Sequence, residues 1–384
     1  MEKKLSRPQL ATYYFPGFHA DPRNELHRGK GWSEWDLVKA AGPRFPGHLQ
    51  PKVPVLGYRD ESTVGVMEEN IDLAADHGID CFLFDWYWYE DRPFLQRPLD
   101  DAFLTAGNRD RLKFALMWAN HDWVDIFPKR LRKDAELIFA GAVTLDVFKR
   151  LTDYAIEHYF TKSNYWKVDG KPYFCIFQLQ TLISGLGGLD QAVEAVEDFR
   201  YRVGKAGFSG LHLNTIVWGR TILPNDPVVK NQQRAISSIG FDSLTSYVWP
   251  NNVEPEGFPQ TSYQRMADKA AVKWEEIQGG YQVPYHPNVT VGWDTSPRAY
   301  QGDPFEKDIY PYVPVYQGNS PDILRDSLRR AAGWVQRHDK KDQIVTLNAW
   351  NEWTEGSYLE PDTEYGMERL KAVADVFSPR EVVS

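Results

Sequence analysis

The chain is organised around the stretch Ile344-Val-Thr-Leu-Asn-Ala-Trp-Asn-Glu-Trp-Thr-Glu-Gly-Ser-Tyr-Leu-Glu360. An apolar run of strand length leads directly into a polar segment that holds two carboxylates, Glu352 and Glu355, three residues apart. Tryptophan and tyrosine residues flank this pair. Sugar-processing sites need such a combination, because one carboxyl gives a proton, the other takes one, and aromatic faces cover pyranose rings.

Eight times along the chain, a short apolar run is followed by a polar or aromatic cluster and then by a helical pattern. The runs have strand length and are rich in β-branched or aromatic residues. They cover residues 10–15, 79–84, 112–117, 172–177, 211–217, 243–248, 289–292 and 344–349. Apolar residues at helical spacing between them predict helices within 64–74, 193–203, 263–277, 324–335 and 370–377, and less regular spacing marks 94–106, 145–159 and 228–239.

Strands that are apolar on both faces and alternate with helices predict a parallel sheet of the α/β class. Eight such units predict a (β/α)8 TIM barrel, and we interpret residues 1–384 as a single catalytic domain of this kind. The alternative is an open doubly wound sheet, but no glycine-rich phosphate loop follows the first run. The surplus length falls mostly after strands, in 20–60, 121–144, 250–261 and 293–320, which predicts long loops on one rim.

The composition restricts the partners of the chain. The net charge is −9, and no block of lysine and arginine occurs, which disfavours nucleic acid and anionic membranes. No apolar run reaches the ~18 residues of a membrane span, and no signal-peptide core is visible, so we expect a cytoplasmic protein, or a periplasmic or secreted one if a leader is removed. Cys81 and Cys175 lie in apolar runs and are expected to be buried free thiols.

The ends of the predicted strands carry the candidate site, because the loops after the strands of such a barrel hold the catalytic residues. At least nine of the 14 tryptophans fall there or in the first loop, mixed with Asp, Asn, His and Glu. This mixture suits a carbohydrate ligand, whose rings stack on aromatic faces while its hydroxyls need fixed polar partners. The alternative is that these tryptophans pack the loops against one another.

Neither a metal nor a cofactor is expected. His19, His121, Asp85, Asp122 and Asp294 lie at strand ends, but no metal-binding spacing connects them.

The two glutamates differ in position from the familiar retaining-glycosidase pair at strands four and seven, because strand four ends in Gln178. At spacing i, i+3 in a turn, Glu352 and Glu355 can face one cavity, whereas in an extended loop they would diverge.

Several motifs resemble the WbsX-like group, which occurs with bacterial surface-polysaccharide genes and is related to glycoside hydrolase family 99, the endo-α-mannosidases. The resemblance spans almost the whole chain. It rests on Tyr13-Tyr-Phe-Pro-Gly-Phe-His19, Gly31-Trp-Ser-Glu-Trp35, Phe45-Pro-Gly-His-Leu-Gln-Pro51, Trp118-Ala-Asn120 and Asn348-Ala-Trp-Asn-Glu-Trp-Thr-Glu-Gly-Ser-Tyr-Leu-Glu-Pro361. The match to family 99 rests mainly on Asn351-Glu-Trp-x-Glu-Gly and implies a (β/α)8 barrel.

The resemblance also implies a mechanism. Glu352 would be the base that takes the proton of the sugar 2-hydroxyl, which attacks the anomeric carbon and gives a 1,2-anhydro sugar. Glu355 would be the acid for the leaving oxygen and then the base for water, so that configuration is retained. Back-side attack restricts substrates to 1,2-trans glycosides such as α-mannosides, α-rhamnosides or β-glucosides. Glu355 should then be the more buried or carboxylate-crowded of the two, and Glu360 either supplies that crowding or lies at the surface.

Other residues are candidates for holding the sugar. By analogy and position they are His19, Glu34, Asp85, Trp118, Asn120, Trp249 and Asn351, joined by the aromatic residues Trp86, Tyr87, Trp123, Tyr247 and Trp353. For Glu34 and Asp85, the alternative to sugar binding is a structural role.

The leading hypothesis is therefore a retaining glycoside hydrolase acting on a 1,2-trans bond, of α-mannoside or α-rhamnoside type, in a polysaccharide or oligosaccharide. A glycosyltransferase of surface-polysaccharide synthesis is one alternative, although no Rossmann-like pattern or Asp-x-Asp motif supports it. The other is a carbohydrate-binding protein without catalysis, which would have no need of two glutamates in one turn.

Overall fold

The computed structural model describes residues 7–223, 231–339 and 341–378. Its central sheet is a nearly closed barrel of parallel strands in the order β12-β10-β9-β8-β4-β2-β1-β15-β13. The bounds are β1 (Gln9–Tyr14), β2 (Cys81–Tyr89), β4 (Lys113–Trp118), β8 (Lys171–Ile176), β9 (His212–Ile216), β10 (Ser243–Thr245), β12 (Tyr285–His286), β13 (Asn288–Thr290) and β15 (Ile344–Asn348). The predicted α/β barrel is confirmed.

The seventh strand is divided, unlike the single run predicted at 289–292. Its first part, β12, pairs with β10, and its second part, β13, pairs with β15. Pro287 lies between the two parts, and a proline has no N–H to donate to a strand ladder. The chain changes its pairing partner at this residue, so the two short strands together connect β10 on one side with β15 on the other.

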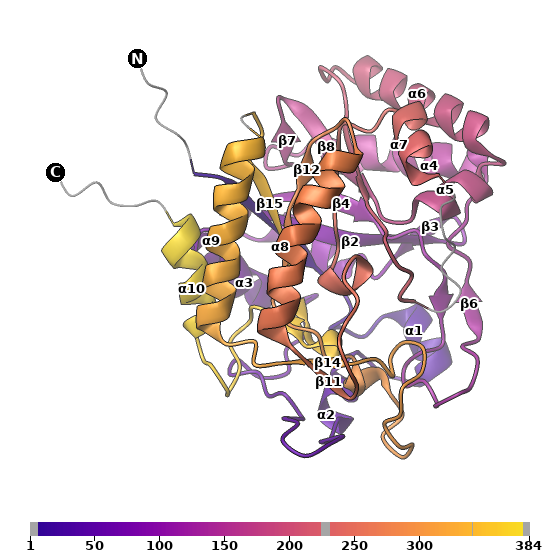
Figure 1. Ribbon diagram of the computed structural model, residues 1–384. Coiled ribbons are helices and arrows are strands. Elements are labelled where there is room, and N and C mark those ends of the chain that lie inside the picture. Colours follow the sequence, from indigo (N-terminus) through magenta and orange to yellow (C-terminus); the bar gives the residue numbers. More distant parts are fainter. Residues whose placement is uncertain (1–6, 224–230, 340, 379–384) are drawn as a thin grey trace.

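Helices cover the outside of the barrel, and Figure 1 shows α8, α9 and α10 side by side on one flank. The covering helices are α3 (Val64–Asp76), α4 (Leu145–Ala155), α6 (Leu189–Lys205), α7 (Gln232–Ile239), α8 (Tyr263–Gly280), α9 (Pro321–His338) and α10 (Glu368–Phe377). α9 illustrates why they form: Ser320 caps its N-terminus, Pro321 opens it, and an apolar stripe faces the strands. The predicted start of α7, residues 228–230, lies outside the described residues.

The helix predicted within 94–106 is shorter and less regular than expected. The chain first turns back after β2 as β3 (Arg92–Phe94), which pairs antiparallel with β2. A π-helical segment, Pro98–Ala102, and a 3-10 helix, Phe103–Thr105, then follow directly on one another.

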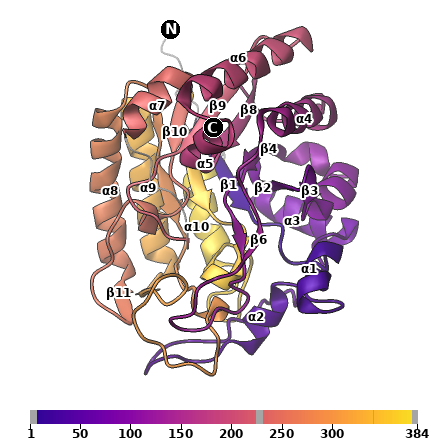
Figure 2. The same ribbon diagram turned by 90° about the vertical axis from the view of Figure 1, so that its right-hand side faces the viewer.

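The long loops follow the carboxyl ends of the strands. They hold α1 (Pro22–Arg28), α2 (Trp35–Ala40), α5 (Leu179–Gly185), and the short strands β5 (Trp123–Val124), β6 (Leu137–Phe139), β11 (Gln260–Ser262), β14 (Val315–Gln317), β16 (Asn351–Glu352) and β17 (Ser357–Tyr358). In Figure 1, α2, β11 and β14 lie at the lower end, and α1, α5 and β6 lie on the right; α2 lies at the lower end of Figure 2 as well. β7 (Lys167–Val168) pairs with the start of β8 instead. Both cysteines are buried free thiols, as predicted. Among the described residues, no helix is long and apolar enough to cross a membrane.

The loops after strands seven and eight touch at two glycines. A Cβ atom at Gly292 would meet the backbone carbonyl of Gly356. We predict that Gly292→Ala lowers the free energy of unfolding by about 1–3 kcal/mol, because backbone must move to admit the methyl group. Urea unfolding followed by tryptophan fluorescence measures the change. Gly279→Ala on α8, where nothing lies within 4 Å, is the control, and equal stability of both variants would contradict the prediction.

Candidate active site

The two glutamates lie on a hairpin that follows β15. β16 and β17 pair antiparallel, and the turn Trp353–Glu355 at the tip brings Glu352 and Glu355 to one side. Gly356 closes the turn in the left-handed region at φ 64°, which suits glycine. The spacing of three residues therefore directs both carboxyl groups into the same pocket, as the turn-like alternative predicted.

Asn351 fixes this hairpin to the first strand. Its amide nitrogen donates to the carbonyl oxygen of Phe15 and to Glu61, and its amide oxygen accepts from the Phe15 N–H. The Trp353 ring stacks on Tyr358 at 3.7 Å and donates its N–H to Glu360. These bonds hold the glutamate-bearing turn rigidly at the barrel mouth.

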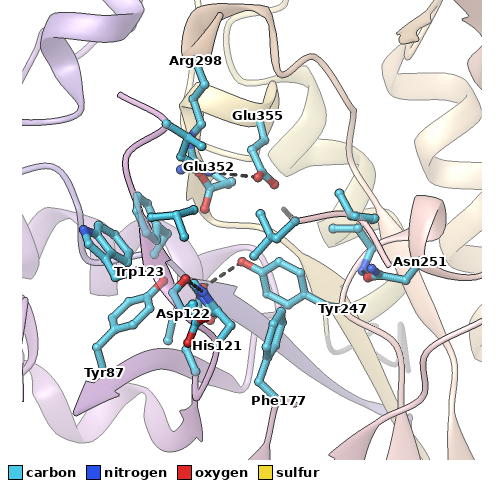
Figure 3. A pocket seen from close by; sticks show the side chains of 18 of the residues that line it. Tyr87, His121, Asp122, Trp123, Phe177, Tyr247, Asn251, Arg298, Glu352 and Glu355 are labelled. Carbon is cyan, nitrogen blue, oxygen red and sulfur yellow. Dashed lines mark hydrogen bonds and ion pairs between the residues drawn. The ribbon is translucent and has the colours of Figure 1, made fainter. Parts of the chain in front are cut away.

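The pocket lies at the carboxyl ends of the strands. Figure 3 shows the carboxyl groups of Glu352 and Glu355 on one side of it, across from Tyr87, His121, Asp122 and Phe177. Burial lowers the pKa of His121 to about 4, so this ring is neutral near pH 7. Aromatic and aliphatic side chains form much of the remaining lining. A lining that combines apolar faces with a few polar groups suits a sugar ring.

Arg298, from the loop after the seventh strand, joins the two glutamates. Its guanidinium donates to Glu352 and to Glu355, each at 3.1 Å, and it lies 3.5 Å from Glu34. Tyr310 donates to the same oxygen of Glu355 at 2.6 Å. The guanidinium is 6% exposed, so its charge depends on these carboxylates rather than on water.

Burial raises the pKa of both glutamates. For Glu352, burial is reinforced by the charges of Glu355, Glu34 and Asp85 against the opposing effect of Arg298. For Glu355, Arg298 and the Tyr310 hydroxyl oppose burial, and Glu34 reinforces it. Glu352 is also the less exposed of the two, at 2% against 6%. Glu352 is thus the more crowded carboxyl, and the expectation that Glu355 would be is not met.

Glu360 neither crowds Glu355 nor lies at the surface. It is buried, accepts the Trp353 N–H and lies 3.5 Å from Arg59. Its neighbouring carboxyl is Glu61, and burial raises the pKa of each.

Asp85 and Tyr247 form the second polar group of the pocket. The Tyr247 hydroxyl donates to one oxygen of Asp85 at 2.8 Å, and the other oxygen has no hydrogen-bond partner although it is buried. Burial raises the pKa of Asp85 well above its usual value. The unpartnered oxygen is a ready acceptor for a substrate hydroxyl.

The predicted sugar-holding residues divide into two sets. Lining the pocket are Asp85, Tyr87, Trp123, Tyr247 and both glutamates, with Glu34 behind Arg298. Away from the lining are His19, Trp86, Trp118, Asn120, Trp249, Asn351 and Trp353.

Local packing explains the second set. Trp86 and Trp118 pack outward against Tyr159 and Phe148 on the helical layer. Other members use their polar groups inside the protein: the Asn120 side chain bonds only the backbone of Gln178, and the Trp249 N–H donates to the Asn288 carbonyl. His19 is buried and does not line the pocket. The interpretation of these tryptophans as a sugar-binding rim is therefore wrong for most of them, and loop and shell packing explains their positions.

Sequence reasoning missed Arg298 and Tyr310, and it did not select Trp218 and Trp293 from the strand ends although both line the pocket. The only signal for Arg298 was an arginine shortly after the seventh strand end, in a loop without periodicity. A group of carboxylates in one pocket nevertheless requires a cation nearby, and such a requirement would have directed attention to it.

Comparisons with known proteins agree with this geometry. Two chains in the solved structures share the fold over nearly their whole lengths. The GH99 endo-alpha-mannosidase from Bacteroides thetaiotaomicron has a TM-score of 0.58 at 12% identity, with 96% of this chain and 95% of that chain covered. A glycoside hydrolase-like protein has a TM-score of 0.62 at 14% identity, with 98% and 96% covered. The likeness to these two structures shows that the barrel fold is shared.

Sequence comparison gives the family. "Uncharacterized protein WxcX" of Xanthomonas campestris pv. campestris, in strains ATCC 33913 and B100, is 27% identical over 376 residues, which is 94% of this chain and 48% of the relative. The chain therefore spans about half the length of the curated relatives it matches. Residues 10–373 match the family described as Glycosyltransferase WbsX, and the chain belongs to that family.

Proposed function

We propose that this protein is a retaining glycoside hydrolase that cleaves a 1,2-trans glycosidic bond in a polysaccharide or oligosaccharide. The observation that carries the proposal is the convergence of Glu352 and Glu355 on one pocket, with Arg298 bonded to both. Two carboxyls whose protonation is coupled through one cation supply an acid and a base at a single site.

The chemistry follows from the order of roles implied by the resemblance. Glu352 takes the proton of the 2-hydroxyl, O2 bonds to the anomeric carbon, and the glycosidic bond breaks as Glu355 gives its proton to the leaving oxygen. Glu355 then takes a proton from water, and the water oxygen attacks the anomeric carbon. The bond between C1 and O2 breaks in this step, and O2 regains its proton from Glu352. Two inversions give overall retention. Asp85 and Tyr247 hold other hydroxyls of the same ring.

Transfer from a nucleotide sugar is the competing activity, because the printed name of the family is glycosyltransferase. The TIM-barrel fold and the acid–base pair favour hydrolysis. Calorimetric titration with nucleotide sugars distinguishes the two, and tight binding together with transfer to an acceptor would refute the hydrolase proposal.

We predict that Glu352→Gln and Glu355→Gln each lower hydrolysis by about 10²- to 10⁴-fold, because each removes one proton-transfer group. A screen of bacterial and host glycans for released reducing ends identifies the substrate, and NMR of the first-formed anomer tests retention. Glu368→Gln, on the exposed face of α10, is the matched control. Wild-type turnover by either site variant, or an inverted product, would rule out the assignment.

The order of the two roles has its own test. With a leaving group that needs no protonation, such as fluoride, and azide as a nucleophile that needs no base, the variant that lacks Glu355 keeps both steps, and the variant that lacks the base for the 2-hydroxyl does not. We predict that Glu355→Gln is rescued and Glu352→Gln is not. The surroundings of the two carboxyls favour the opposite order, since Glu352 is the more buried and has more carboxylates around it. Rescue of Glu352→Gln alone would therefore exchange the two roles.

Arg298 sets the pH dependence. Its charge lowers the pKa of both carboxyls, so Arg298→Gln should raise both pKa values further. A base must be deprotonated to act, and we predict that the acidic limb of the kcat/KM profile moves to higher pH, whereas Arg298→Lys moves it less. The control is Arg130→Gln, which removes an exposed arginine that pairs with Asp303 in the loop of Arg298. An unmoved acidic limb in Arg298→Gln would contradict the argument.

A further inference from the structure

The polar groups of the pocket come from strand ends and their turns. Asp85 is on β2, Tyr247 follows β10, and the glutamates follow β15. Together with Arg298 they supply donors and acceptors, including the unpartnered oxygen of Asp85. Hydroxyl groups of a bound sugar ring find their partners in this set.

A different set of side chains lines the same pocket from two loops. We call Val124, Ile126, Ile222 and Leu223 the aliphatic wall; the first two follow β4 and the last two follow β9. Val124 and Ile126 are each 4% exposed, and Ile222 and Leu223 pack against the core. Met117 of β4 adds a further apolar side chain to the lining.

The aliphatic wall has no hydrogen-bonding group in its side chains. A sugar hydroxyl facing it would leave water without gaining a partner, which is unfavourable. Nor does the aliphatic wall offer a flat π face for stacking, a role that the aromatic residues elsewhere in the lining fill. A methyl group in the same place would bury apolar surface without leaving a polar atom unpaired.

We propose that the glycosyl unit bound here is a 6-deoxyhexose whose methyl group faces the aliphatic wall. This inference rests on the proposed function, which requires a bound glycosyl unit with an unsubstituted 2-hydroxyl group. C6 is the exocyclic carbon of a hexopyranose, so it can be a methyl group in place of a hydroxymethyl group without changing the ring chemistry at C1 and C2.

Matched substrate pairs test the proposal. The pairs are 4-nitrophenyl glycosides of α-D-mannose, α-L-mannose and β-D-glucose, each compared with its own 6-deoxy form, so that only one oxygen differs. We expect the 6-deoxy member of the hydrolysed pair to have a kcat/KM higher by about 10- to 100-fold. Equal rates, or preference for the hydroxylated member, would overturn the inference while leaving the hydrolase proposal intact.

Binding separates the two proposals when no pair is hydrolysed. Such a result counts against hydrolysis. Calorimetric titration of the Glu355→Gln variant with the same glycosides then measures whether the pocket prefers the 6-deoxy member, independently of turnover. Tighter binding of a 6-deoxy member supports the inference. Equal affinity, tighter binding of the hydroxylated member, or no binding overturns it.

Substitutions in the aliphatic wall give an independent test. Val124→Thr replaces a methyl group by a hydroxyl with little change of volume, and Ile126→Thr replaces an ethyl group by a hydroxyl. We expect each to reduce the preference for the 6-deoxy member toward unity. Val143→Thr is the matched control, because Val143 is buried but does not line the pocket. Should either variant fail to fold, Ile222→Thr, at a partly buried position, takes its place. The inference would be overturned if every folded variant of the aliphatic wall kept the full preference for the 6-deoxy member.

Discussion

The site depends on one buried cation. Arg298 bonds to Glu352, Glu355 and the Thr354 hydroxyl, and it lies within ion-pair distance of Glu34. Removing one partner of a buried ion pair typically costs about 3–5 kcal/mol of stability. The effects of the arginine and of the carboxylates on stability are therefore not independent of one another. Burial alone would lower the pKa of Arg298, but the surrounding carboxylates raise it well above its usual value. The loop after strand seven and the turn after strand eight are held together by this charge.

The barrel was predictable because its signals are local. Each strand is an apolar run buried on both sides, and each helix has its own apolar stripe, so eight repeats of one pattern indicated the fold. The division of the seventh strand was harder to foresee, since it depends on which neighbour each half meets. Pro287 was visible in the sequence, but the change of partner at that residue is a property of the closed sheet.

The site was only partly predictable, for a related reason. A residue at a strand end was assumed to face the pocket, but neighbouring residues on a strand point to opposite sides. Asp85 and Tyr87 point inward, so Trp86 between them must point outward, and Trp118 beside the inward Met117 does the same. Applying this alternation would have removed both tryptophans from the candidates. Arg298 lies in an irregular loop, where no periodicity gives the direction of a side chain.

The contact between the last two loops has a consequence for how such proteins diversify. The Asp294 N–H donates to the carbonyl oxygen of Glu355 at 2.5 Å, and Gly292 lies against Gly356. Neither loop can therefore be exchanged for one of another length or shape while the other stays unchanged. A graft intended to alter specificity has to carry both segments as one module. The loop after β4 is tied to this module as well, because the Lys129 N–H donates to the carbonyl oxygen of Arg298 at 2.8 Å. Any change of substrate preference through Val124 or Ile126 therefore has to keep that bond.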